Sequence, residues 1–263
     1  MKNLTSCGDI AYVSGTKHQN TGDPSLIFVH GAGQTHDFWN RQIDTIGDRY
    51  HCMALSLPGH GESGGKGRNL ISGYAADILD FLDRLEITAP VICGLSMGGA
   101  IVQHLLINHA NTIKAGILVN TGARLKVLPA IFEVISNDFD HFIDMVYAQG
   151  VSPQHQSETM FKRVRAFTDC TPQVTSDDFI ACNEFDTMNQ LHRITAPVLV
   201  LGAEDDKLTP VKYAHFLVDS IRGAKLEIIR KAGHFSPVER PETVNRAIIK
   251  FVGGLTHSHT EKL

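Results

Sequence analysis

Residues 91–99, VICGLSMGG, place Ser96 between two glycines in the pattern G-x-S-x-G. The apolar or small residues before this serine predict a buried strand, and the apolar residues at helical spacing after it predict a helix. A sharp strand-to-helix turn brings the chain close to itself, so Gly94 and Gly98 leave the room that such a turn needs. A hydroxyl beside the positive end of a helix is typical of a nucleophile in acyl transfer. The alternative is a Gly-rich turn in an unrelated α/β protein.

A serine nucleophile needs a base, an orienting acid and hydrogen-bond donors for an oxyanion. His234 is the candidate base, because it follows the last predicted strand and a loop there can lean back over the sheet. The candidate acids are three consecutive carboxylates, Glu204, Asp205 and Asp206. Successive loop residues point in different directions, so sequence chemistry alone does not choose among the three.

Short apolar runs alternate with amphipathic segments, which is typical of a parallel sheet with helices on both faces. The predicted strands cover residues 9–13 (an edge strand), 25–29, 51–57, 91–94, 115–119, 198–201 and 225–229. The predicted helices cover residues 38–46, 73–85, 98–108, 211–220 and 241–252. The candidate catalytic residues therefore come at the ends of strands, where ligands bind in open α/β sheets.

About 75 residues between Asn120 and Pro197 interrupt this alternation and indicate mainly short helices, rich in Phe and Met. Such an insertion is predicted to form a helical lid over the carboxyl ends of the strands. The predicted division is a core of residues 1–120 and 197–263 and a lid of residues 121–196. Most lid aromatics are expected to pack within the lid, and two or three to line the pocket.

The composition is that of an ordinary globular domain: 43% hydrophobic residues, 20% charged residues and a net charge of -4. Nothing in it suggests a nucleic-acid surface or a polybasic membrane face. The five cysteines contain no CxxC pair, which argues against a disulfide framework or a zinc site. Neither a signal peptide nor a membrane-length apolar run is visible, so we expect a cytoplasmic protein. A small-molecule substrate without metal or organic cofactor is expected, and the oligomeric state is left open.

The chain resembles lid-bearing members of the α/β-hydrolase superfamily from about Ile10 to Val252. The resemblance rests on HGAG at 30–33, PGHGES at 58–63 and GLSMGG at 94–99, and on the order serine, acid, histidine along the chain. It implies the α/β-hydrolase fold, with a mostly parallel central sheet flanked by helices and with a helical lid.

The resemblance also bears on the orienting acid. Family members commonly carry D-x-[LIV]-[TV]-P after this strand, and counting back from Pro210 selects Asp206. Counting three residues forward from Gly202 selects Asp205 instead. We prefer Asp206, because the proline fixes the start of the next helix, whereas the glycine end tolerates an extra residue.

By the same resemblance, the backbone N–H groups of Ala32 and Met97 would form the oxyanion hole. His30 and His60 would hold their loops and take no part in proton transfer. Arg124 lies at the predicted lid entrance, where a guanidinium could pair with an anion on the substrate. The alternative for Arg124 is a hinge salt bridge.

The predicted reaction is hydrolysis of a small carboxylic ester or lactone through an acyl-enzyme on Ser96, as in EC 3.1.1 hydrolases. His234 would act as the base and Asp206 would orient its imidazole. Carbon–carbon bond hydrolysis and cofactor-free haloperoxidase chemistry use the same three residues and stay open. A non-catalytic receptor that binds a small apolar molecule is the remaining alternative.

Overall fold

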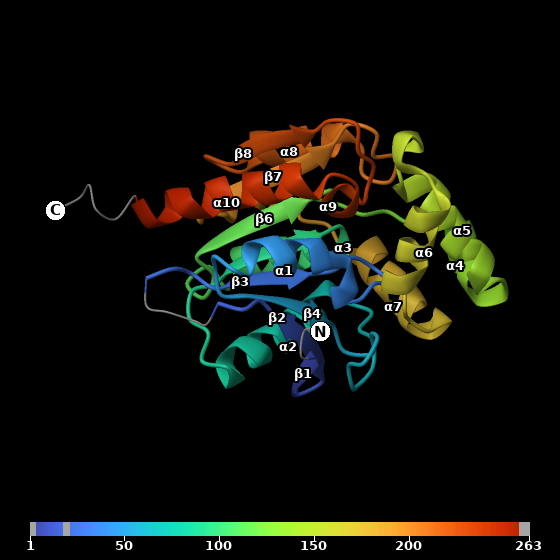
Figure 1. Cartoon of the computed structure of the whole chain (residues 1–263), viewed down its shortest axis with the longest axis horizontal. Helices are drawn as coiled ribbons and strands as arrows, with labels where there is room; N and C mark the ends of the chain where they lie inside the picture. Colours follow the sequence, from blue (N-terminus) through green and yellow to red (C-terminus); the bar gives the residue numbers. More distant parts are fainter. Residues whose placement is uncertain (1–3, 18–21, 258–263) are drawn as a thin grey trace.

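The chain folds around one eight-stranded sheet (Figure 1). The computed structural model describes residues 4–17 and 22–257, so the ends of the predicted core, 1–3 and 258–263, lie outside the described residues. The strands lie in the order β1-β2-β4-β3-β5-β6-β7-β8. Their bounds are β1 (Leu4–Cys7), β2 (Ile10–Ser14), β3 (Leu26–Val29), β4 (Cys52–Ser56), β5 (Val91–Leu95), β6 (Ala115–Val119), β7 (Val198–Ala203) and β8 (Lys225–Ile229).

The six strands from β4 to β8 in this order run parallel to one another, whereas β2 pairs antiparallel with both β1 and β4. Every residue of β3, β4, β5, β6 and β7 is buried, because helices cover both faces of a parallel sheet. This burial explains why these strands stand out as continuous apolar runs. The mostly parallel sheet confirms the predicted fold class.

The sheet edge differs from the prediction. The sequence predicts an edge strand at residues 9–13, but β2 pairs on both sides, with β1 and with β4. The edge is β1, whose sequence LTSC is largely exposed. A four-residue strand with polar, exposed positions carries neither an apolar run nor a clear alternation, so the pattern did not reveal it.

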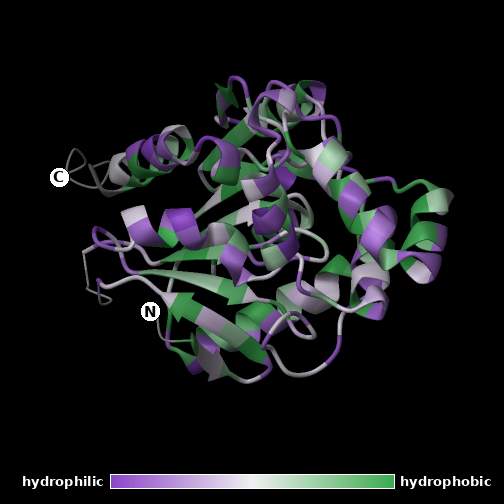
Figure 2. Ribbon diagram, turned by 45° about the vertical axis from the view of Figure 1, so that its right-hand side comes forward, coloured by the Kyte–Doolittle hydropathy of each residue, from purple (hydrophilic) through white to green (hydrophobic). Residues whose placement is uncertain are grey.

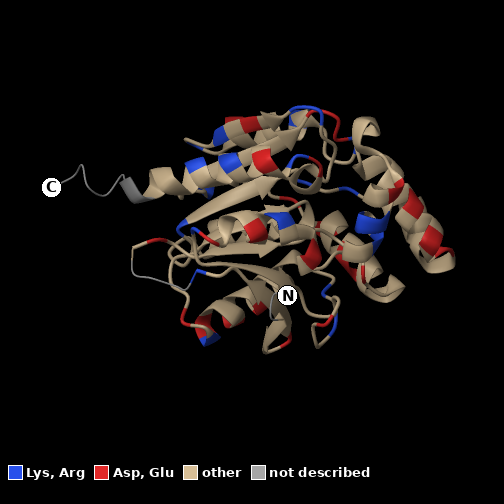
Figure 3. Cartoon of the chain, viewed as in Figure 1, with Lys and Arg blue, Asp and Glu red and all other residues tan. Residues whose placement is uncertain are grey.

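Helices pack on both faces of the sheet and form two apolar layers with it. The bounds of these helices are η1 (His36–Trp39), α1 (Asn40–Ile46), α2 (Ile71–Arg84), α3 (Met97–Asn108), α8 (Val211–Ser220), α9 (Ser236–Glu239) and α10 (Pro241–His257). In β3, Ile27 and Val29 pack in the layer with α2, α3 and α8, whereas Leu26 and Phe28 pack in the layer with α1 and α10. Figure 2 shows the apolar residues concentrated in the strands, and Figure 3 shows the charged residues mainly on the surrounding helices and loops.

The segment between β6 and β7 forms a separate group of helices at one end of the sheet (Figure 1). Phe142 stacks on Phe139 and meets Phe179 edge-on, so part of the segment packs on its own small core. Its elements are α4 (Pro129–Asn137), α5 (Phe139–Gly150), η2 (Pro153–His155), α6 (Glu158–Phe167), α7 (Pro172–Glu184) and η3 (Leu191–Arg193). Across residues 4–17 and 22–257, no helix is long and apolar enough to cross a membrane.

Candidate active site

Ser96 lies in the tight turn that joins β5 to α3, with φ 52° and ψ -112°. A positive φ is rare and strained for a residue with a side chain, and such strain is often found at functional sites. A Cβ on Gly94 would collide with the backbone of Gly98, and a Cβ on Gly98 would collide with the carbonyl oxygen of Val29. The two glycines of the motif are therefore required by the close passage of the chain.

His234 lies in the loop after β8 and is hydrogen-bonded to Asp206, which lies in the loop after β7. The distance from His234 Nδ1 to Asp206 Oδ2 is 2.9 Å, and both side chains are buried. The carboxylate is held in turn by the backbone N–H groups of Leu208 and Thr209, at 2.8 and 2.9 Å, and by the Thr209 hydroxyl, at 2.8 Å. Because Nδ1 donates to the carboxylate, Nε2 is the ring atom that can accept a proton.

The two neighbouring carboxylates face other partners. Asp205 Oδ2 accepts a hydrogen bond of 2.6 Å from the Ser152 hydroxyl, and Glu204 Oε2 accepts one of 2.9 Å from Lys231 N–H. Of the three consecutive acids that the sequence offers, Asp206 is the one that the structure brings to His234. Asp205 instead ties its loop to the segment between β6 and β7.

A cavity of about 310 Å³ lies against three of the predicted site residues. Ser96, His234 and Ala32 all line it. The rest of its wall is mainly apolar and comes largely from the segment between β6 and β7; it includes Leu125, Val127, Leu128, Ile131, Val146, Phe179, Cys182, Leu208, Tyr213 and Phe235. A mainly apolar pocket with a few convergent polar groups is typical of a small-molecule site.

Ala32 lies in the loop after β3, where buried side chains hold the backbone. His30 Nδ1 donates to Gly31 O at 2.7 Å, and His30 Nε2 accepts from Leu57 N–H at 3.0 Å. One ring nitrogen donates and the other accepts, which requires a neutral imidazole. Burial accordingly holds the pKa of His30 well below its ordinary value. Met97, the other predicted oxyanion residue, is the first residue of α3, where backbone N–H groups have no partner within the helix.

Arg124 is not one of the residues that line this cavity. Its guanidinium lies 3.9 Å from the Asp186 carboxylate, and the two residues also form an isolated backbone bridge. Arg124 lines another cavity, of about 250 Å³, with Met188 and Tyr213. These contacts favour the hinge salt bridge over substrate recognition.

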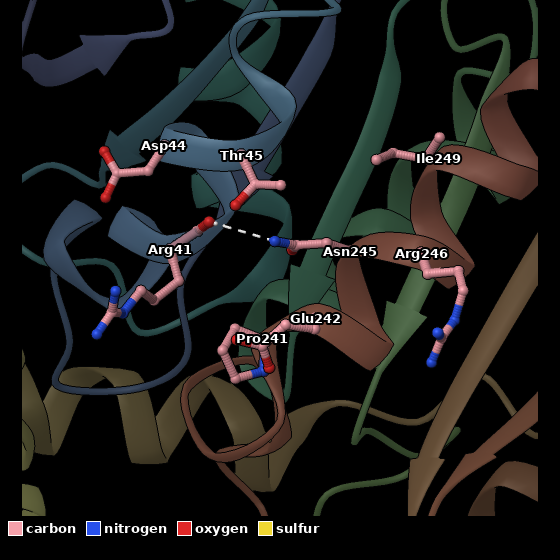
Figure 4. Close-up of a pocket in the computed structure, with 8 residues that line it drawn as sticks. All are labelled: Arg41, Asp44, Thr45, Pro241, Glu242, Asn245, Arg246 and Ile249. Atoms are coloured by element: carbon pink, nitrogen blue, oxygen red, sulfur yellow. Dashed lines mark hydrogen bonds between the residues drawn. The ribbon is translucent and has the colours of Figure 1, made fainter.

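A cavity of about 270 Å³ between α1 and α10 is distinct from the site around Ser96 (Figure 4). Arg41 and Arg246 lie at opposite sides of it and their guanidinium groups do not meet, Glu242 lies between them, and Asp44 lies on the far side of Arg41. This arrangement does not converge on a common ligand. Within the described ranges 4–17 and 22–257, no group of three or more His, Cys, Asp or Glu side chains could hold a metal ion.

Two buried residues that sequence reasoning missed hold the His234 loop. Asn120, directly after β6, has φ 42° and donates to His234 O at 2.7 Å and to the Ser236 hydroxyl at 2.9 Å. Glu239 accepts from the N–H groups of Gly233 and Ser152. Burial raises the pKa of Glu239, although these backbone hydrogen bonds oppose the shift. For Asn120, the one signal in the sequence is an asparagine directly after a predicted strand, because asparagine tolerates a positive φ.

Asp178 is a third missed residue, fully buried on α7. Its Oδ2 accepts from Gly33 N–H at 2.7 Å and lies 2.8 Å from His60 Nε2, and its Oδ1 accepts from the Tyr74 hydroxyl. Helical spacing could have indicated that Asp178 is buried, because it lies four residues after Val174 on the same buried face of α7.

The stability of the protein is expected to depend on pH through His60. Burial lowers the pKa of His60, but the Asp178 carboxylate and the carbonyl oxygens of Pro58 and Leu57 together raise it by more, so the net shift is upward. A histidine whose pKa is raised on folding stabilises fully below its unfolded pKa, about 6.5, and this stabilisation is lost as the pH rises through the folded pKa. The free energy of unfolding lost in His60→Gln, measured in urea, should therefore be larger at about pH 5.5 than at about pH 8.5.

His104→Gln is the matched control, because burial lowers the pKa of His104 on α3. Its effect should have the opposite sign: below about pH 6.5 the unfolded chain takes up a proton on His104 more readily than the folded protein does, which destabilises the folded state, so the substitution helps at low pH. Equal losses for His60→Gln at both pH values would contradict the ion pair with Asp178.

Comparison with known proteins gives independent evidence on the family to which the chain is related. Residues 26–247 match the sequence model of the Alpha/beta hydrolase family. The chain is 29% identical over 241 residues to 3-oxoadipate enol-lactonase 2 of Acinetobacter baylyi, covering 86% of this chain and 87% of that protein. It is 22% identical over 245 residues to a pimeloyl-(acyl-carrier protein) methyl ester esterase of Vibrio vulnificus, covering 88% of this chain and 94% of that protein. The crystal structure of the enol-lactonase from Burkholderia xenovorans LB400 superposes with a TM-score of 0.87 at 21% identity, covering 95% of this chain and 100% of that one.

Proposed function

The chain belongs to the alpha/beta hydrolase family, and on that premise we propose that it hydrolyses a small carboxylic ester or lactone through an acyl-enzyme on Ser96. The observation that carries the proposal is the 2.9 Å hydrogen bond between His234 and Asp206, with Ser96 and His234 lining the same cavity. The named relatives support the bond type, because they are an enol-lactonase and a methyl ester esterase.

In the proposed reaction, Ser96 Oγ attacks the substrate carbonyl carbon while His234 Nε2 takes the hydroxyl proton. The oxyanion accepts hydrogen bonds from the N–H groups of Ala32 and Met97. The bond to the alcohol oxygen then breaks, and the proton on Nε2 passes to that oxygen, leaving an acyl-serine. Water attacks this ester, gives a proton to His234, and releases the carboxylic acid as the proton returns to Ser96. Asp206 orients the imidazole and stabilises its charged form throughout.

We also propose that residues 121–196 act as a lid on this site. Cavity-lining side chains come from α4, α5 and α7, for example Ile131, Val146 and Phe179. The Ser152 hydroxyl reaches Asp205 beside the orienting acid, which anchors the segment to the core. A lid in this position would cover the bound substrate and limit the access of bulk water to the site.

The size of the cavity is expected to limit the substrate. A volume of about 310 Å³ is at the small end for ligand pockets. The kcat/KM for p-nitrophenyl butyrate should therefore exceed that for p-nitrophenyl dodecanoate by at least about tenfold, because a long chain finds no room beside the leaving group. The two esters share one leaving group, so the ratio reports the acyl side. A ratio near one would show that the cavity does not limit the length of the acyl chain.

The experiment that tests the function is a turnover screen of the purified protein with a fluorophosphonate probe alongside. The screen covers p-nitrophenyl esters, lactones, vinylogous diketones and peroxide-dependent halogenation, because these reactions share the same three residues. Ester or lactone turnover together with labelling of Ser96 supports the proposal. Labelling of Ser96 with turnover only of diketones or halide would replace it with those reactions. Folded protein that binds a small apolar molecule without labelling or turnover would be a receptor.

A further inference from the structure

The peptide groups on both sides of Ala32 are held by buried side chains. The peptide group that carries the Ala32 N–H shares its plane with Gly31 O, which accepts the hydrogen bond from His30 Nδ1. The next peptide group carries the Gly33 N–H, which donates to Asp178 Oδ2 at 2.7 Å. Gly33 has φ +67°, a left-handed backbone conformation that residues with a side chain rarely adopt. Two side chains therefore fix the backbone angles of Ala32 from both sides.

The Asp178 carboxylate is itself held by further donors. His60 Nδ1 faces the carbonyl oxygens of Leu57 and Pro58, at 3.2 and 3.1 Å, and His60 Nε2 faces the carboxylate. Both ring nitrogens must donate, so His60 carries a positive charge here. The Tyr74 hydroxyl donates to the other carboxylate oxygen. A buried carboxylate with charged and neutral donors on both oxygens is a rigid acceptor.

Backbone hydrogen bonds also join the chain just before α7, the helix that carries Asp178, to the loops of the core. Thr35 N–H donates to Phe167 O at 2.9 Å, and Gly61 N–H donates to Asp169 O at 3.2 Å. These bonds attach the connection between α6 and α7 to the loops after β3 and β4. The position of Asp178 relative to Gly33 is thus set by the backbone as well as by its own side chain.

We propose that Asp178 is a positioning residue for the oxyanion hole. It holds the peptide group beside Ala32 through Gly33 N–H, while His30 holds the peptide group that carries the Ala32 N–H itself. This inference rests on the proposed acyl transfer at Ser96. Loss of one oxyanion donor costs about 10²- to 10³-fold in kcat, so a donor that is displaced but not removed should cost about 10- to 100-fold.

Asp178→Asn tests this proposal with little change in volume. The amide removes the negative charge that pairs with His60 and leaves one acceptor oxygen in place of two, so Gly33 N–H, His60 and the Tyr74 hydroxyl can no longer all donate to residue 178. With p-nitrophenyl acetate we expect kcat to fall about 10- to 100-fold and KM to change less than about threefold. Affinity for a trifluoromethyl ketone, which forms a tetrahedral oxyanion adduct on serine, should fall by the same factor as kcat. Affinity for the product acetate, which has no such adduct, should stay at the parent value.

Asp177→Asn is the matched control, because Asp177 is the next residue on α7 and its carboxylate accepts from the exposed Gln173 side chain. It should keep the parent kcat and ketone affinity within about twofold. Tyr74→Phe is a milder variant, for use if Asp178→Asn does not fold. It removes one donor from the carboxylate and should lower kcat and ketone affinity together, by about threefold.

The results separate this proposal from the proposed function. Parent activity on esters with unchanged kcat in folded Asp178→Asn would overturn the positioning role and leave the function standing. A fall in kcat without a matching fall in ketone affinity would also overturn it. Parent protein that neither hydrolyses esters nor reacts with a fluorophosphonate would overturn both. If only the fluorophosphonate reacts, its rate of reaction with Ser96 replaces kcat as the readout, because the phosphonyl oxygen occupies the same hole.

Discussion

Ser96→Ala is expected to lower kcat/KM for p-nitrophenyl acetate by about 10⁴- to 10⁶-fold, because it removes the proposed nucleophile. The substitution keeps the Cβ and removes one hydroxyl, so the free energy of unfolding should change by less than about 1 kcal/mol. The measurement is steady-state hydrolysis at neutral pH, with a fluorophosphonate labelling assay and urea unfolding on the same preparations. Labelling should disappear with the turnover, while the unfolding curve is retained.

Ser136→Ala is the control for this experiment. Its hydroxyl is exposed on α4 and donates to Phe132 O at 2.9 Å, away from the cavity. Parent turnover within about twofold is expected, as for an ordinary surface substitution. A folded Ser96→Ala protein that retains a tenth or more of the parent turnover would exclude Ser96 as the nucleophile.

Asp206→Asn is expected to lower kcat by about 10³- to 10⁴-fold, because an amide at this position favours the wrong tautomer of His234, the proposed base. Asp206 Oδ2 accepts the hydrogen from His234 Nδ1, whereas an asparagine NH₂ group would donate to that nitrogen and leave the hydrogen on Nε2. The base would then lack the lone pair that takes the serine proton. Steady-state kinetics across about pH 6 to 9 measure this effect, since the activity that remains should rise as hydroxide replaces the base.

Asp205→Asn provides the comparison within the same loop. Its carboxylate accepts from the Ser152 hydroxyl, which an asparagine oxygen can also accept. We therefore expect kcat within about threefold of the parent. A larger loss for Asp205→Asn than for Asp206→Asn would reverse the assignment of the orienting acid.

Much of the fold could be predicted from the sequence, for a physical reason. Strands such as β3 and β5 are buried on both faces, so they appear as continuous apolar runs that end in glycine-rich turns. The family prediction is confirmed by the match over residues 26–247. The exposed strand β1 gives no such pattern, because neither of its faces is selected for burial.

The surroundings of the site could not be predicted in the same way. Asp178 meets Gly33 across 145 positions of the chain, and Asn120 meets His234 across 114. Helical spacing can indicate that a residue is buried, but it does not tell which distant loop comes to lie against it. The same holds for Asp205 and Asp206, since adjacent residues with identical side chains differ only in the direction that the folded loop gives them.

The order of the strands has a consequence for how the protein reaches its native state. Gly116 pairs with Val198 and Ile27 pairs with Ile92, so neighbouring strands of the sheet come from remote parts of the chain. Such non-local topology is typical of slow folding, because long loops must close before their contacts stabilise them. Ser96, Asp206 and His234 follow three different strands, so the three side chains meet only after β5, β7 and β8 have assembled in the sheet. Recovery of turnover after dilution from denaturant should consequently be among the last signals to return, later than the regain of helical circular dichroism.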